Sequence, residues 1–125
     1  MINAIIFLLF GSSYVLIEML FRGYSHWSMF ILGGLCGVLI GLINENTPKM
    51  NIFKQMLLGS IIVTVLEFLC GYVINIKLGL NVWDYSNMPF NFMGQVCLLF
   101  SFVWFLLSYI VVKLDDYFRL KLEEI

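Results

Sequence analysis

Charged residues are scarce in this chain of 125 residues. Asp, Glu, Lys and Arg together make up 12% of it, whereas hydrophobic residues make up 62%. A soluble domain is about a quarter charged and about half apolar. A chain this short has too high a surface-to-volume ratio to bury so much apolar area in a water-facing fold. The composition therefore excludes a soluble domain and predicts that lipid covers the hydrophobic surface.

Basic residues, histidines and metal-ligand spacings are also few. The net charge is −1 and no basic stripe is present, which excludes a nucleic-acid-binding surface. The single histidine, His26, lies beside Trp27, and an interfacial position is expected for it rather than a role as ligand or base. Cys36, Cys70 and Cys97 lie in apolar runs without CxxC spacing, as small hydrophobic residues of packed helices do. No metal or cofactor is expected.

Two enzyme signatures are missing as well. The P-loop pattern GxxxxGK[ST] does not occur, so this chain cannot itself supply the ATPase of an ABC system. No base is placed in the sequence to activate a serine or tyrosine as a nucleophile. The chain is therefore not expected to be an enzyme.

Four apolar segments reach, or nearly reach, the ~20 residues of helix that cross a hydrocarbon core. The expected spans are residues 2–21, 27–43, 53–76 and 90–112. Residues 113–125 are expected to continue the last helix into water, with their mixed charges forming a solvated face; a docking surface is the alternative. No linker divides the sequence. We therefore expect one all-α, polytopic transmembrane domain over residues 1–125.

Basic residues predict the orientation of these spans. Four spans place both termini and the middle loop on one side of the membrane. That side carries five of the seven basic residues, which are Lys49, Lys54, Lys113, Arg119 and Lys121. Only Arg22 and Lys77 lie on the other side. The positive-inside rule thus predicts a multi-pass protein of the bacterial inner (cytoplasmic) membrane with both termini in the cytoplasm.

A weak internal repeat indicates a duplicated helical hairpin. The aligned segments are residues 15–20 with 64–69, and residues 30–36 with 91–97. This alignment places Glu18 on Glu67 and Gly33 on Gly94. Because each half begins on the cytoplasmic side, the halves would be parallel repeats about an axis along the membrane normal. Chance similarity between apolar segments is the alternative interpretation.

Two acidic residues, Glu18 and Glu67, lie inside the expected spans. An ionised carboxylate at a helix centre costs about 2.5–3.5 kcal/mol, so such a residue pairs, faces a bundle interior or stays protonated. Glu18 has Arg22 one turn further on, on the same helix face, which predicts a local ion pair near the outer end. Glu67 lies about two turns before Asn75 and has no cation within reach on its own helix. A group on another helix, or a ligand, is expected to satisfy it.

The stretch WDYSNMPFNFMGQ, residues 83–95, is polar despite its hydrophobic flanks. Trp83 and Tyr85 are residues that prefer the headgroup level of a membrane. Ser86 or Asn87 is expected to cap the fourth helix, with Pro89 in its first turn. The fourth helix is therefore expected to begin at the outer boundary of the membrane.

On the first turns of that helix, Asn91 and Gln95 would share one face and line an outer vestibule opposite Glu67. The alternative is that the stretch only caps the helix and anchors it at the interface. The candidate ligand-binding residues are Glu18, Arg22, Glu67, Asn75, Trp83, Asp84, Tyr85, Asn91 and Gln95.

The second half of the chain resembles the ABC-transporter type IV family, small bacterial membrane proteins labelled CmpB-like permeases. The shared pattern is E-F-x-x-G, then N, then W-D-Y-S, then P-x-N-x-x-G-Q and S-x-x-W. The matching residues are Glu67, Phe68, Gly71, Asn75, Trp83, Asp84, Tyr85, Ser86, Pro89, Asn91, Gly94, Gln95, Ser101 and Trp104. The resemblance implies a permease-like membrane protein and leaves a separate ATPase subunit as an expected partner. It names no solute.

The leading hypothesis is a homo-oligomeric channel or transporter with a polar site around Glu67. Gly33, Gly37 and Gly41 recur every four residues, a spacing that lets helix backbones approach closely, either between subunits or within one chain. The alternatives are a phage holin-like protein that forms membrane lesions, and an accessory subunit that docks on a larger complex through its C-terminal helix.

Overall fold

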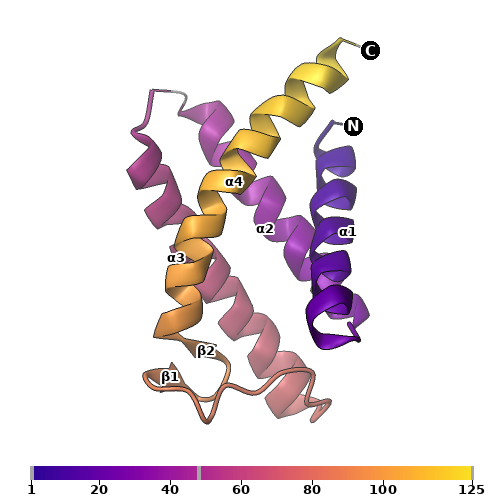
Figure 1. Ribbon diagram of the computed structural model, residues 1–125, viewed down its shortest axis with the longest axis vertical. Helices are drawn as coiled ribbons and strands as arrows, with labels where there is room; N and C mark the ends of the chain where they lie inside the picture. Colours follow the sequence, from indigo (N-terminus) through magenta and orange to yellow (C-terminus); the bar gives the residue numbers. More distant parts are fainter. Residues whose placement is uncertain (1, 48, 125) are drawn as a thin grey trace.

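A computed structural model describes residues 2–47 and 49–124 of the chain. Its long helices are α1 (Ile2–Arg22), α2 (Trp27–Asn46), α3 (Ile52–Gly71) and α4 (Leu98–Glu123) (Figure 1). A π-helical segment, η1 (Tyr72–Lys77), continues α3, and strands β1 (Asn91–Phe92) and β2 (Val96–Cys97) form a small antiparallel hairpin. In the part of the chain described, four helices are long and apolar enough to cross a membrane, α3 and η1 counting as one. The all-α, four-span fold class is confirmed.

The two termini lie at the same end of the bundle as the connection between α2 and α3 (Figure 1). We call this the inner end. The α1–α2 turn and the loop of residues 78–97 lie at the opposite, outer end. The first three helices follow the expected spans closely, and α4 runs without interruption to Glu123, so the last helix does continue beyond the expected span.

The start of the fourth span differs from the prediction. The expected span of residues 90–112 is wrong, because α4 begins only at Leu98. Phe90 has φ +55° and Gly94 has φ +73°, a left-handed backbone that interrupts any helix. The Asn91 carboxamide oxygen accepts a hydrogen bond from the Gly94 N–H, 3.0 Å away. Such local side-chain bonds let Asn stabilise a turn in place of a helix.

The structure contradicts one of the two aligned pairs of the proposed repeat. Residues 15–20 and 64–69 both lie in the first helix of a hairpin that starts at the inner end. Residues 30–36 lie within α2, whereas residues 91–97 form the β-hairpin and its turn. The second pair is therefore not structurally equivalent.

Glycines of α2 let α1 pack closely against it. A Cβ atom built at Gly33 would lie 2.7 Å from the Tyr14 Cβ, and one built at Gly37 would lie 2.5 Å from the Phe10 ring. Both distances are too short for a side chain to fit without a shift of its neighbour. The spacing of these glycines therefore serves packing within one chain.

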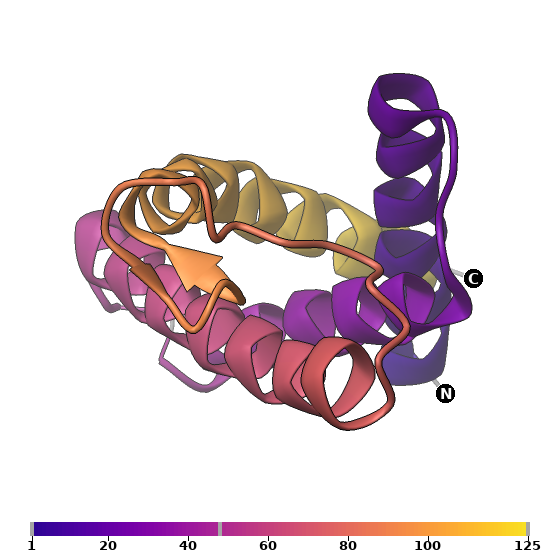
Figure 2. The same ribbon diagram turned by 90° about the horizontal axis from the view of Figure 1, so that it is seen from below.

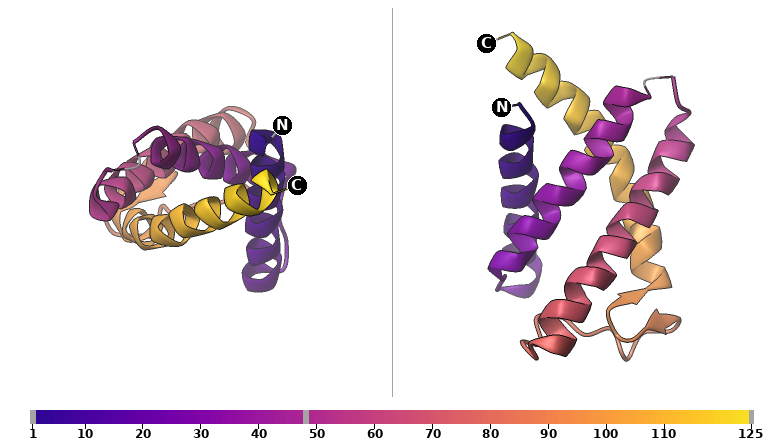
Figure 3. Two further views of the ribbon diagram at one scale, coloured as in Figure 1. Left: turned by 90° about the horizontal axis from the view of Figure 1, so that it is seen from above. Right: turned by 180° about the vertical axis from the view of Figure 1, so that it is seen from behind.

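Helix α1 stands beside the other three helices rather than between them. Figure 2, seen from the outer end, shows α1 at one side of the group formed by α2, α3 and α4. In Figure 3, α2 lies between α1 and α3. Aromatic rings make the lateral contacts of α1 with α4: Phe10 packs on Phe118 with centroids 5.9 Å apart, and Tyr14 packs on Trp104 at 6.1 Å. Contact between α1 and α4 is thus limited to a few side chains.

Candidate functional site

Glu67 lies in the outer half of α3 with 2% of its surface exposed. The Tyr85 hydroxyl donates to one carboxylate oxygen at 3.3 Å, and the Trp104 indole N–H donates to the other at 3.4 Å. Tyr85 comes from the outer loop and Trp104 from α4. In residues 2–47 and 49–124 Glu67 has no ion-pair partner. An ionised carboxylate is costly in such a place unless a cation approaches it.

A cavity of about 170 Å³ adjoins Glu67 and is bordered by all four helices. Its wall is almost entirely apolar. Besides Glu67, the lining includes Tyr14 on α1, Gly33 and Cys36 on α2, Val63 on α3, and Trp104 and Ser108 on α4. The Ser108 hydroxyl donates to the Trp104 carbonyl at 2.7 Å, so its proton is used within its own helix. Among the described residues that line this cavity, Glu67 is the only one with a carboxylate.

Asn75 and Gln95 form a separate buried network at the outer end. Asn75 donates to the Gln95 carboxamide oxygen at 2.8 Å and accepts from the Val82 N–H at 2.7 Å. The Trp83 indole N–H donates to the Gln95 carbonyl at 3.0 Å. Asn75 is 8% exposed and Gln95 is 5% exposed. These groups satisfy one another and hold the loop across the outer end of the bundle (Figure 2).

The expected outer vestibule is accordingly not built as predicted. Asn91 and Gln95 do not share a helix face opposite Glu67, because they lie in β1 and in the turn before β2. The structure instead brings Tyr85, another of the candidate residues, to Glu67. The sequence could not distinguish them, since each lies in a segment whose conformation depends on tertiary contacts.

The remaining predicted residues of the loop, Asp84 and Asn91, form turns. Asp84 accepts from the Ser86 backbone N–H at 2.9 Å, and this bond together with the Ser86 hydroxyl lowers the pKa of the Asp84 carboxyl. The Asn91 amide donates to the Met88 carbonyl at 2.8 Å. The helix cap expected from Ser86 or Asn87 is wrong, because Cys97 is the residue that precedes α4.

Pro89 is likewise not in a first helical turn, because the loop continues to Cys97. The polar character of this stretch is explained by turn formation and by closure of the outer end.

Glu18 and Arg22 form the predicted ion pair on α1, with N and O atoms 2.8 Å apart. Arg22 also donates to the Val82 carbonyl at 3.0 Å and thereby joins the end of α1 to the outer loop. His26 caps α2, where its Nδ1 accepts from the Ser28 N–H at 3.2 Å. Glu18 is thus neutralised by the protein itself, unlike Glu67.

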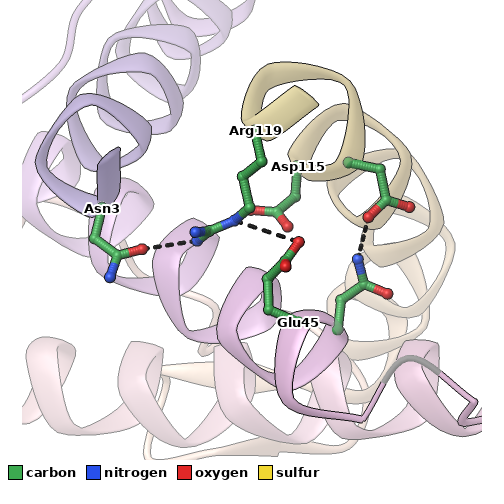
Figure 4. A network of polar contacts seen from close by, with 6 residues as sticks. Asn3, Glu45, Asp115 and Arg119 are labelled. Atoms are coloured by element: carbon green, nitrogen blue, oxygen red, sulfur yellow. Dashed lines mark hydrogen bonds and ion pairs between the residues drawn. The ribbon is translucent and has the colours of Figure 1, made fainter. Parts of the chain in front are cut away.

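A second polar cluster, at the inner end, was not predicted (Figure 4). Arg119 of α4 lies 2.9 Å from Asp115 and 3.7 Å from Glu45 of α2, and it donates to Asn3 of α1 at 2.8 Å. Asp115 is fully buried. The solvated face expected for residues 113–125 is therefore wrong at these two residues of α4. The i, i+4 spacing of Asp115 and Arg119 is the feature of the sequence from which this ion pair could have been predicted.

This inner cluster also gathers further acidic and amide groups. The Asn44 amide donates to the Asp116 carboxylate. One carboxylate oxygen from each of Glu45, Asp115 and Asp116 lies within 4.8 Å of the others. Because Arg119 already places a positive charge among them, we interpret the cluster as a structural tie between α1, α2 and α4.

Comparison with known proteins gives one family. The family model described as "Putative ABC-transporter type IV" matches residues 1–122. No solved structure matches the chain. The family match extends beyond the motif-bearing second half and includes α1, α2 and the inner cluster.

Proposed function

The chain belongs to the ABC-transporter type IV family, and on that premise we propose that it is a permease-like transporter whose ligand site is the cavity beside Glu67. The chain is a multi-pass membrane protein of a transport-related family. One observation carries the proposed site: an acidic side chain, 2% exposed, borders an apolar cavity without a cationic partner among the residues described.

The hydrogen bonds of Glu67 support a ligand site rather than a structural role. At 3.3 and 3.4 Å they are longer than the 2.5–3.2 Å usual for strong protein hydrogen bonds, so the carboxylate retains capacity for another partner. Asn75, by contrast, has bonds of 2.7 and 2.8 Å at its two ends. Ionisable residues inside membrane spans commonly mark substrate or ion pathways.

A transporter is favoured over an open channel by the closed outer end. Trp83 is 5% exposed and Val82 6% exposed, and both lie in the loop that covers this end of the bundle. A continuous pore along the bundle axis would need the loop to move. The family match favours transport over the holin-like alternative.

The proposal is tested by comparing Glu67→Gln with Glu18→Gln, two isosteric changes on helices of the same bundle. Each protein is reconstituted in liposomes on a solid-supported membrane, and currents are recorded after concentration jumps of ammonium, ethylammonium and acetate salts. We expect a protein-dependent current that Glu67→Gln lowers by about tenfold or more, because a buried charged partner is lost. Glu18→Gln should retain the current and lower stability, since it leaves Arg22 without its partner.

The opposite pattern would contradict the assignment of the ligand site to Glu67. If Glu67→Gln carried the full current while Glu18→Gln carried none, the ligand site would belong to α1 and the outer loop. Equal amounts of folded protein in the liposomes, measured by size-exclusion chromatography before reconstitution, make the two variants comparable.

A second candidate function is that of a membrane subunit coupled to a separate ATPase, which the family name supports. The last turns of α4 extend past the bundle at the inner end (Figure 1). Tyr117 is 55% exposed there and Leu120 is 60% exposed. Coexpression with a candidate ATPase subunit tests the idea, and a double Tyr117→Ala, Leu120→Ala variant should weaken their copurification.

A further inference from the structure

We propose that the cavity beside Glu67 takes a single-chain amphiphile with a cationic head group, an alkylammonium, which reaches the cavity sideways from the hydrocarbon core. This inference rests on the proposed function, because it names the ligand class of the same cavity. It follows from the shape of the cavity, from the place where the cavity opens and from the charge at one end of it.

The cavity is long in the direction of the helices. Its lining on α1 extends from Phe10 to Ile17, and its lining on α4 extends from Trp104 to Leu114. At 1.5 Å per residue these stretches measure about 10 and about 15 Å along their helices. A cavity of about 170 Å³ that extends over that length is narrow. It suits an extended alkyl chain better than a compact solute.

The rim of the cavity lies on the side of the bundle. Five of its lining residues are themselves exposed: Ser13 and Ile17 (47%) on α1, and Leu107 (37%), Ile110 (50%) and Leu114 (39%) on α4. The opening therefore lies between α1 and α4, where the two helices have few contacts. Four of these rim residues are apolar, and the hydroxyl of the fifth, Ser13, donates to the Leu9 carbonyl of its own helix at 2.7 Å. This opening therefore faces lipid once the helices cross a membrane. A ligand that comes this way must first dissolve in the bilayer.

The outer end of the cavity selects the head group. Glu67 lies there, and its carboxylate attracts a cation and repels an anion in surroundings of low dielectric constant. The neighbouring acid, Glu18, is already paired with Arg22. The rings of Tyr14 and Trp104 line the same region, with centroids 6.1 Å apart, and aromatic faces attract an ammonium group. An alkylammonium thus matches the charge at one end and the apolar wall along the rest.

The test uses decylammonium, decanol and decanoate, which share one alkyl chain and differ in the charge of the head group. The full chain is placed in phosphatidylcholine nanodiscs, and its thermal unfolding midpoint is measured at equal mole fractions of each amphiphile in the lipid. Decylammonium should raise the midpoint by about 5 °C or more at saturation, because a ligand that binds only the folded state stabilises it. Glu67→Gln should lose this rise, and Glu18→Gln should keep it.

A matched pair of variants tests the lateral opening. Leu107 lines the cavity rim, whereas its neighbour Leu106 is 50% exposed on α4 and does not line the cavity. Leu107→Trp should narrow the opening and reduce the decylammonium rise by at least half, and Leu106→Trp should leave the rise unchanged. An equal rise in both tryptophan variants would overturn the lateral route.

Other outcomes separate this inference from the proposed function. If decanol raised the midpoint as much as decylammonium, in wild type and in Glu67→Gln alike, the cationic ligand class would be wrong. If none of the three amphiphiles raised the midpoint, the amphiphile class would be wrong, and a Glu67-dependent current in liposomes would still support the transport proposal. The absence of both the rise and the current would overturn both.

Discussion

Buried polar residues of this protein fall into two kinds, which differ in whether the chain itself completes their hydrogen bonds. Asn75 is held at both ends of its carboxamide, by Gln95 and by the Val82 N–H. Glu67 is as deeply buried but has only two long bonds from neutral donors. The first arrangement stabilises a fold, and the second leaves a place for a ligand.

Replacing Asn75 with alanine should therefore lower stability substantially. The change leaves the Val82 N–H and the Gln95 side chain buried without a partner, and each such group costs about 1–3 kcal/mol. Asn87→Ala, at an exposed position of the same loop, is the control and should change stability little. Unfolding in mixed micelles with increasing SDS measures both. Equal stability of the two variants would show that the loop is not held by Asn75.

Among the helices, α1 is joined to α4 mainly through the inner end. Arg119 donates to Asn3 and pairs with Asp115, while Phe118 packs on Phe10. Nearer the outer end, the rim of the cavity lies between the same two helices. The inner cluster thus joins α1 to α4 on the inner side of the cavity.

Arg119→Gln should destabilise the protein by about 3 kcal/mol or more, because breaking a buried ion pair leaves an uncompensated carboxylate at Asp115. Adding Asp115→Asn should recover a large part of that loss, since it removes the unpaired charge. Lys113→Gln, on the exposed side of α4, should have little effect. Unfolding in mixed micelles with increasing SDS measures these variants as well. A double variant no more stable than Arg119→Gln would contradict the claim that Arg119 compensates the buried Asp115 charge.

Viewed as a whole, the molecule places both termini at one end, as an even number of spans requires. The basic residues are concentrated at that end, so we predict that it is cytoplasmic. Self-association stays a prediction, and the α2 glycines do not support it, because they face α1 and α4 of their own chain.

The orientation is tested by labelling introduced cysteines in intact cells, after Cys36, Cys70 and Cys97 have been changed to alanine. Asn87→Cys, in the exposed outer loop, should react with a membrane-impermeant maleimide added outside. Thr47→Cys, at the exposed inner end of α2, should react only after the membrane is permeabilised. The reversed pattern would place the outer loop in the cytoplasm.

Composition and local spacing by themselves determined the class of this protein, its four membrane-length helices and the ion pair of Glu18 with Arg22. These features depend on hydrophobic length and on contacts one helical turn apart, which any helix of this sequence would make. The motif around Glu67 and residues 83–95 also sufficed to indicate the family.

Only the tertiary structure decided where α4 begins, what satisfies Glu67 and which charged residues of the last helix are buried. Phe90 and Gly94 adopt left-handed backbone in the outer loop. The Asn75–Gln95 bond, across 20 residues, helps to hold this loop over the end of the bundle. Trp104 reaches Glu67 across 37 residues, and Arg119 reaches Asn3 across 116. Such pairings depend on how the helices pack. Each helix buries only part of its surface against the others, so the packing depends on all four helices together.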